Sequence, residues 1–487
     1  MSADTAGGIR NIAIGNYAGD AITSGDDNTL LGHTAGGAIN SGVASTFIGQ
    51  EAGLTNTTGS SNTAVGNLAL RLNATTDDNT AVGRSALAAN VADGNTAVGR
   101  SALTANTTGT ENVAVGHSAL ATNTTTNRNT AVGYASLTAN VAANNTAVGY
   151  GALNANSTGA DNIAVGYGAA ELNTTGTRNI AIGANAYNSS DTENDNIAIG
   201  YDAMTTDTAG GTKNIALGNN TLKALTSGDR NVAIGDTSLE ANAGGGNNTA
   251  IGDSSMYTNV SGNNNTALGY GTLAVNLAGN NTAVGANAMV ANTTAVSCVA
   301  VGYNALAANT TGGHNTAIGD LSLDANTDGE LNVAVGANAL TTLNGGDNNV
   351  AVGRECLRLA TTSSNNTAVG AQAGAAITDG HSNVCIGYSA GSSITTGDNH
   401  ISIGFEAAIT GSPGGNQATN NNRIGLGDEN ISHANIQVDW TVASDQRDKT
   451  DFTTLDLGLD FVNDLKPVTY KWDKRSKYGD KYADDYD

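Results

Sequence analysis

Residues 129–133 read NTAVG, and the phrase returns as NTAVG at 145–149 and as NIAVG at 162–166. The motif N-x-A-[VIL]-G and its variants recur in both directions along the chain. Between Gly15 and Gly404 they end in 24 glycines, here called the corner glycines. The 23 intervals between these glycines are 16, 17 or 18 residues long. A register kept over about 390 residues is the signature of a solenoid or a fibre.

Each period can be interpreted physically. In NTAVG the residues three and one before the Gly lie on one face of a short strand, and the Ala between them lies on the other. The Gly permits a corner that a Cβ would obstruct. After it we expect a second short strand, as in RSALAAN at 84–90, and then a turn rich in Asn, Thr and Gly. The predicted fold class is all-β, a parallel β-roll or β-helix of about 24 coils, roughly 115 Å long at about 4.8 Å per coil.

The same alternation predicts which face is buried. Thr, Ile and Val share one strand position, so we expect them to form a buried rather than a displayed ladder, which argues against an ice-binding Thr array. The Ala face would then be left in water, and burying it against identical faces of other chains favours a homo-oligomer. The phrase resembles the head repeats of trimeric autotransporter adhesins over most of residues 11–404. That resemblance implies parallel β-rolls that associate as a homotrimer.

Composition and charge exclude several classes of protein. Lys and Arg number 20 against 43 Asp and Glu, a net charge of −23, which disfavours nucleic acid and anionic membrane surfaces as partners. With 39% hydrophobic residues and only 2 Pro, the chain is neither disordered nor collagen-like. We expect no membrane insertion, because no apolar run approaches the roughly 20 residues that a spanning helix needs. The first ten residues, MSADTAGGIR, do not resemble a signal peptide.

No cofactor or metal site is predicted. Cys298, Cys356 and Cys385 occupy positions that elsewhere hold Asn or Ala, so we interpret them as small-residue substitutions rather than a disulfide or metal set. The six histidines never share a repeat. Carboxylates in the repeats show no paired arrangement of the kind that glycan cleavage needs.

The composition changes near residue 440. Residues 441–487 hold 19 charged residues of 47, against 44 in the 440 residues before them. We therefore predict a repeat shaft over 1–404, an irregular end or tip and linker over 405–440, and a separate small α+β domain from 441. In the last, a short helix is expected before Pro467 and the strand VTYKW after it.

Two phrases in this last segment, SDQRDK at 444–449 and GLDFVNDLKPVTYKW at 458–472, resemble the start of the self-cleaving intramolecular chaperone that ends endosialidase-type phage tail spikes and fibres. The resemblance implies that 441–487 is the N-terminal part of a domain that helps three chains assemble and then cuts itself off. It also implies Ser444 as nucleophile, Lys449 as base, Asp445 and Arg447 as supporting residues, and a scissile bond after Ala443. A Ser hydroxyl does need such a base, and a Lys of lowered pKa can serve.

These observations predict a structural fibre protein of a phage or virus, made in the host cytoplasm and carried on the virion. Its expected partners are itself, other tail proteins and a glycan or protein receptor on the host surface. Any catalysis is expected to be a single self-cleavage. Two alternatives stay open: a cell-surface adhesin or extracellular filament subunit built from the same repeat, and a polysaccharide-degrading tail spike.

Overall fold

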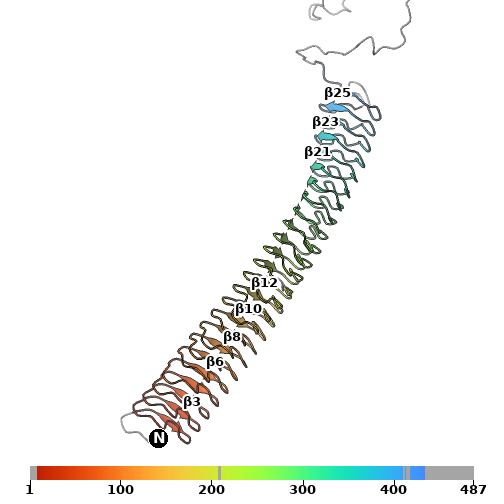
Figure 1. Ribbon diagram of the computed structural model, residues 1–487. Coiled ribbons are helices and arrows are strands. Elements are labelled where there is room, and N and C mark those ends of the chain that lie inside the picture. Colours follow the sequence, from red (N-terminus) through yellow and green to blue (C-terminus); the bar gives the residue numbers. More distant parts are fainter. Residues whose placement is uncertain (1–7, 207–209, 410–411, 413–416, 434–487) are drawn as a thin grey trace, which may run out of the picture. The chain divides into compact units, whose positions relative to one another are not determined.

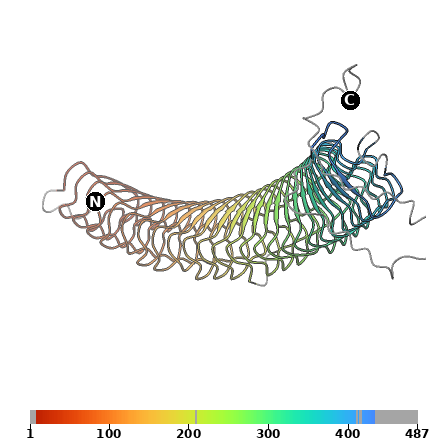
Figure 2. The ribbon, with the colours of Figure 1, turned by 90° about the horizontal axis from the view of Figure 1, so that it is seen from above.

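The computed structural model describes residues 8–206, 210–409, 412 and 417–433. Within them the chain forms three-residue strands that follow one another along one side of a solenoid (Figures 1 and 2). The strands are β1 (Ile12–Ile14), β2 (Thr29–Leu31), β3 (Thr46–Ile48), β4 (Thr63–Val65), β5 (Thr80–Val82), β6 (Thr96–Val98), β7 (Val113–Val115), β8 (Thr130–Val132), β9 (Thr146–Val148), β10 (Ile163–Val165), β11 (Ile180–Ile182), β12 (Ile197–Ile199), β13 (Ile215–Leu217), β14 (Val232–Ile234), β15 (Thr249–Ile251), β16 (Thr266–Leu268), β17 (Thr282–Val284), β18 (Val299–Val301), β19 (Thr316–Ile318), β20 (Val333–Val335), β21 (Val350–Val352), β22 (Thr367–Val369), β23 (Val384–Ile386), β24 (Ile401–Ile403) and β25 (Ile424–Leu426).

Each strand pairs in parallel with the next strand along the chain, at equivalent positions of the repeat. In β10 and β11, for example, Ile163 pairs with Ile180 and Ala164 with Ala181. The longer interval after β24 does not break this ladder, because Ile401 still pairs with Ile424 of β25. The described part of the chain is thus an all-β parallel solenoid with the predicted 17-residue spacing. It contains no helix, and accordingly no candidate for a membrane-spanning helix.

The prediction of a second strand in each coil is wrong. The residues two and four after a corner glycine adopt left-handed backbone angles, as in Ser85 (φ 58°) and Leu87 (φ 50°), so this side of the coil is a run of turns. Left-handed residues at alternate positions cannot form an extended strand. Each coil therefore has one three-residue strand, while turn residues such as Leu87, which donates to the carbonyl of Ala102, add backbone hydrogen bonds between coils.

The predicted orientation of the strands is also wrong. Ala164 is fully buried, whereas its neighbours Ile163 and Val165 are 40% and 36% exposed. The same pattern holds from β2 to β24: the middle residue points into the coil, and neither flanking residue is buried. A coil of 17 residues encloses so little space that Ala, opposite an Ala-Leu pair, fills it. The larger β-branched side chains must face outward.

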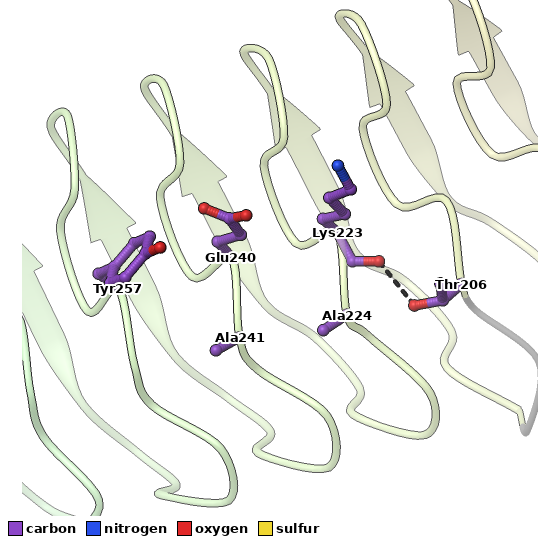
Figure 3. Close-up of a pocket in the computed structure, with 6 residues that line it drawn as sticks. All are labelled: Thr206, Lys223, Ala224, Glu240, Ala241 and Tyr257. Carbon is purple, nitrogen blue, oxygen red and sulfur yellow. Dashed lines mark hydrogen bonds between the residues drawn. The ribbon is translucent and has the colours of Figure 1, made fainter.

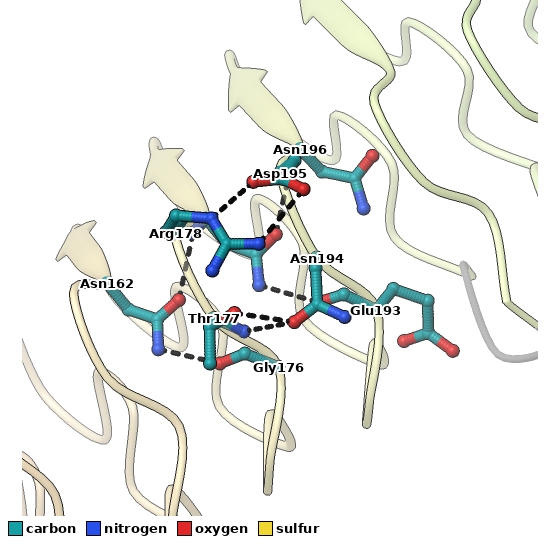
Figure 4. Close-up of polar contacts among 9 residues, drawn as sticks. Asn162, Gly176, Thr177, Arg178, Glu193, Asn194, Asp195 and Asn196 are labelled. Atoms are coloured by element: carbon teal, nitrogen blue, oxygen red, sulfur yellow. Dashed lines mark hydrogen bonds and ion pairs between the residues drawn. The ribbon is translucent and has the colours of Figure 1, made fainter.

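A column of buried Asn side chains joins each coil to the next (Figure 4). The Oδ1 atom of Asn162 accepts the backbone N–H of Asn179 at 2.9 Å, while its Nδ2 atom donates to the carbonyl of Gly176 at 2.8 Å. Asn179 repeats both bonds, to the backbone N–H of Asn196 and the carbonyl of Glu193. Each amide thus satisfies one buried donor and one buried acceptor, which would otherwise cost free energy. We call this column the Asn ladder.

The corner glycines have a steric reason to be invariant. Gly166 has φ +140°, and a Cβ placed on it would lie 2.4 Å from the carbonyl oxygen of Gly183 in the next coil. Both the backbone angle and the approach of the two coils exclude a side chain there.

Candidate functional sites

The outward positions of β1–β24 form a long apolar surface, here called the strand face. Every residue directly before a corner glycine, from Ile14 to Ile403, is Val, Ile or Leu, and none of them is buried. The other outward position of each strand is Thr in half of the strands and Ile or Val in the rest. A contiguous aliphatic column of this length is far larger than the apolar patches of ordinary monomers, so it indicates an interaction surface.

A second surface feature is a column of aromatic rings directly after the corner glycines. His117, Tyr134, Tyr150 and Tyr167 stack in succession, with ring centroids 5.2, 5.1 and 5.3 Å apart and interplanar angles of 11°, 7° and 12°. The three tyrosines are 51–61% exposed. Sequence reasoning missed this column, although its signal was the dipeptide Gly-Tyr recurring at 133–134, 149–150 and 166–167. Within such a stack the ring faces cover one another, so the apolar face that is open to a ligand is the outer face of the last ring, that of Tyr167.

A hollow of about 370 Å³ lies on the turn side of four successive coils (Figure 3). The ammonium group of Lys223 at its edge pairs with Asp202 at 3.1 Å. Glu240 is the single carboxylate among the lining residues. Hydrolysis of a glycoside generally requires two carboxylates across the scissile bond, so the hollow has the shape of a binding site without that catalytic pair. It is lined by Thr206, Lys223, Ala224, Glu240, Ala241 and Tyr257.

Charged side chains on the turns pair between neighbouring coils. The guanidinium of Arg178 donates to both carboxylate oxygens of Asp195, at 2.6 and 3.1 Å (Figure 4). Hydrogen bonds from Arg178 hold the pKa of Asp195 below its usual value. Arg10 has the same effect on the pKa of Asp27. Such exposed pairs add little to stability.

The three cysteines are free and buried, at interior positions that hold Asn or Ala in other coils. Burial raises the pKa of the Cys356 and Cys385 thiols to about 12, and it raises the pKa of Cys298 as well. Thiols that stay protonated are poor nucleophiles and poor metal ligands. Among the described residues, no group of three or more His, Cys, Asp or Glu side chains is placed to hold a metal ion.

The predicted cleavage residues, Ser444, Asp445, Arg447 and Lys449, lie outside the described residues, as does Ala443. Their roles stay predictions, as do the domain boundaries near 404 and 440 and the helix and strand expected around Pro467.

Residues 444–485 match the family model described as the chaperone of endosialidase. Among curated proteins, none matches the chain. The match begins at Ser444, the residue that sequence reasoning places directly after the scissile bond. The chain is thus a parallel β-solenoid repeat protein that carries, near its C-terminal end, a segment similar to the chaperone of endosialidase.

Proposed function

We propose that the protein is a fibre of a phage or virus that makes contact with the host surface. One observation carries this proposal: a long regular solenoid is followed in the sequence by a segment that matches the chaperone of endosialidase. A solenoid supplies length at constant cross-section, which suits mechanical reach. The proposed location is the virion, with other tail proteins and a host-surface receptor as partners.

The fibre is proposed to be a homotrimer joined through the strand face. The Ala face on which the sequence argument relied is buried within each coil, so it cannot supply the interface. The aliphatic residues before the corner glycines are exposed instead, and they run the length of the solenoid. Burying identical apolar columns against one another would remove them from water without bringing together the acidic turns of each chain.

The chaperone segment gives such a repeat a means of alignment. Every coil resembles its neighbours, so three chains could pair in many shifted registers of similar energy. Non-local β pairing is also slow, because distant segments must meet before any contact stabilises them. A C-terminal domain that brings the three chains into register would reduce both difficulties, and its later removal would leave the assembled shaft kinetically trapped.

Self-cleavage is proposed to occur between Ala443 and Ser444. Neutral Lys449 accepts the Ser444 hydroxyl proton as Oγ attacks the carbonyl carbon of Ala443. The C–N bond breaks, the departing amine takes a proton, and an ester links Ala443 to the Oγ atom. Water then hydrolyses the ester, which leaves a carboxylate on Ala443 and a free amine on Ser444. The net reaction is the hydrolysis of one peptide bond by one water molecule.

Intact-mass measurement tests this proposal. The wild-type chain, the Ser444→Ala variant and a Ser476→Ala control are expressed from the complete gene. We expect wild type and the control to end at Ala443 and Ser444→Ala to stay full length. If all three stay full length where oligomers form, the self-cleavage is refuted. Attachment is tested separately, by whether the purified fibre blocks adsorption of the virion to host cells.

A further inference from the structure

We propose that two open tyrosine pairs on the solenoid, Tyr167 with Tyr201 and Tyr270 with Tyr303, each hold one sugar ring of a neutral polysaccharide. The inference rests on the proposed attachment function and names the class of receptor. It places the receptor contact on the shaft itself.

The argument begins with the aromatic column. Tyr167 is the last ring of the continuous stack, and the equivalent position in the next coil is Ala184 rather than an aromatic residue. The coil after that carries Tyr201. The same order recurs further along the chain, where Ala286 separates Tyr270 from Tyr303. In both places the column keeps its two outer rings and lacks the middle one.

The missing ring leaves a gap of useful width. Neighbouring rings in the continuous stack are 5.1–5.3 Å apart. Rings two coils apart should therefore be separated by about 10 Å, whereas a ring held between two others needs about 7–8 Å for carbon contacts on both sides. The methyl group of Ala184 or Ala286 closes only the base of the gap. All four tyrosines are exposed, from 53% to 61%, so the gap opens to solvent.

The surroundings favour a saccharide over other flat ligands. A pyranose ring has apolar C–H faces, which suit the two tyrosines, and a rim of hydroxyl groups. At the first pair, polar residues directly follow the column positions, Asn185 after Ala184 and Asp202 after Tyr201, and the Asn185 Nδ2 atom donates to the Asp202 Oδ1 atom at 3.1 Å. At the second pair, Asn287 and Asn304 occupy the same two positions. Amide and carboxylate oxygens accept hydrogen bonds from hydroxyls, and amide N–H groups donate to them.

The charge of the protein selects among saccharides. A net charge of −23 per chain repels sialylated or uronic acid polymers, so neutral sugars are the favoured ligands. The two pairs lie six coils apart, about 29 Å at about 4.8 Å per coil. A long polymer could occupy both pairs on one chain, and simultaneous binding would raise the overall affinity well above that of either pair.

The test fills the gaps instead of removing rings. In the full-length assembled protein, Ala184→Tyr/Ala286→Tyr completes both stacks, so that the fold keeps its aromatic column while the sugar loses its space. The matched control is Ala337→Tyr, which lies in the same column between Asp320 and Arg354 and therefore closes no aromatic gap. The probes are dextran, mannan and chitohexaose, with polysialic acid as the anionic comparison, and binding is measured by isothermal titration calorimetry.

We expect wild type and Ala337→Tyr to bind at least one neutral probe, and the filled variant to bind it about tenfold more weakly or worse. Tyr201→Ala/Tyr303→Ala should lose binding to a similar extent. Absence of binding to every neutral probe, binding to polysialic acid alone, or unchanged binding by the filled variant would each overturn the inference. If the filled variant still blocks virion adsorption, the attachment function stands and only its assignment to these gaps fails.

Discussion

The ring of Phe47 occupies the space above Gly53 that a leucine side chain fills in most coils. A Cβ on Gly53 would lie 2.6 Å from the Cδ2 and Cε2 atoms of Phe47. In the next coil the equivalent residues are Ala64 and Leu70, both fully buried. The large strand residue Phe47 thus faces a glycine across the coil. The small strand residue Ala64 faces the large side chain of Leu70. In these two coils the interior is filled by different residues, with the large side chain on the strand in one and on the opposite turn in the other.

Gly53→Leu should destabilise the solenoid, and adding Phe47→Ala should restore much of the loss. The single substitution overfills the coil, at a cost of about 1–3 kcal/mol or more, while Phe47→Ala alone leaves a cavity that costs about 3–5 kcal/mol. Together they recreate the pair seen in Ala64 and Leu70. Backbone strain is not the obstacle, because Leu70 adopts φ 51° where Gly53 adopts φ 58°.

Urea unfolding of the two single variants and the double variant measures this coupling. Gly94→Leu serves as a control for the backbone angle, since Gly94 has φ +68° and a Cβ added to it would meet no atom within 4 Å. If the losses of the two single variants simply add in the double variant, the volume argument fails.

Asn112→Ala should lower the free energy of unfolding by about 1–3 kcal/mol, because it leaves a buried donor and a buried acceptor without partners. Those groups are the backbone N–H of Asn129, 3.0 Å from the Oδ1 atom, and the carbonyl of Thr126, 2.8 Å from the Nδ2 atom. Asn67→Ala is the control, since its side-chain contacts are exposed and 3.4–3.5 Å long. Hydrogen exchange should show the loss at Asn129; equal effects of the two variants would contradict the role of the Asn ladder.

Charges on the strand face should break up the proposed trimer. Val148→Lys/Val165→Lys places two ammonium groups among exposed aliphatic residues that the interface would bury. Light scattering coupled to size-exclusion chromatography should show a trimer for wild type and a smaller species for this variant. Thr158→Lys/Thr175→Lys adds the same charge on exposed turn residues and should stay trimeric. A monomeric wild type, or a trimeric Val148→Lys/Val165→Lys variant, would refute the interface.

The cysteines should react only when the solenoid opens. Because the pKa of Cys356 and Cys385 is about 12 in the folded chain, both stay protonated near pH 8, and a thiol reagent should modify them only in denaturant. The unfolded thiols ionise first as the pH rises, since their pKa is about 8.5. Their contribution to stability is therefore complete below about pH 8.5 and is lost progressively toward pH 12. Cys356→Ala/Cys385→Ala should show a weaker loss of stability over this range; rapid labelling of the native wild type would contradict the assignment.

The sequence predicted the coil count, the parallel register and the positions of the cysteines, because a fixed period determines which residues stack. It did not predict which strand face is inside. Alternation separates Ala164 from Ile163 and Val165 but does not say which side is buried, and the usual preference for aliphatic cores gave the wrong answer. The deciding quantity is the width of the coil, which depends on turns such as Ser85–Leu87 whose left-handed angles have no strong sequence signature outside Gly and Asn.

The Asn ladder also determines how a fibre of this kind would carry load. A pull along the solenoid passes through every coil-to-coil contact in series, so the fibre is only as strong as the weakest of these contacts. Most contacts include one Asn side chain that makes both of its bonds, but Ser45, Cys298 and His400 stand at three of these positions. Ser45 reaches the backbone N–H of Asn62 at 3.3 Å, and the Cys298 Sγ atom lies 3.4 Å from the carbonyl of Gly312. Under tension the shaft should open first at these three coils, and the rest of the solenoid would stay folded while the local opening takes up the extension.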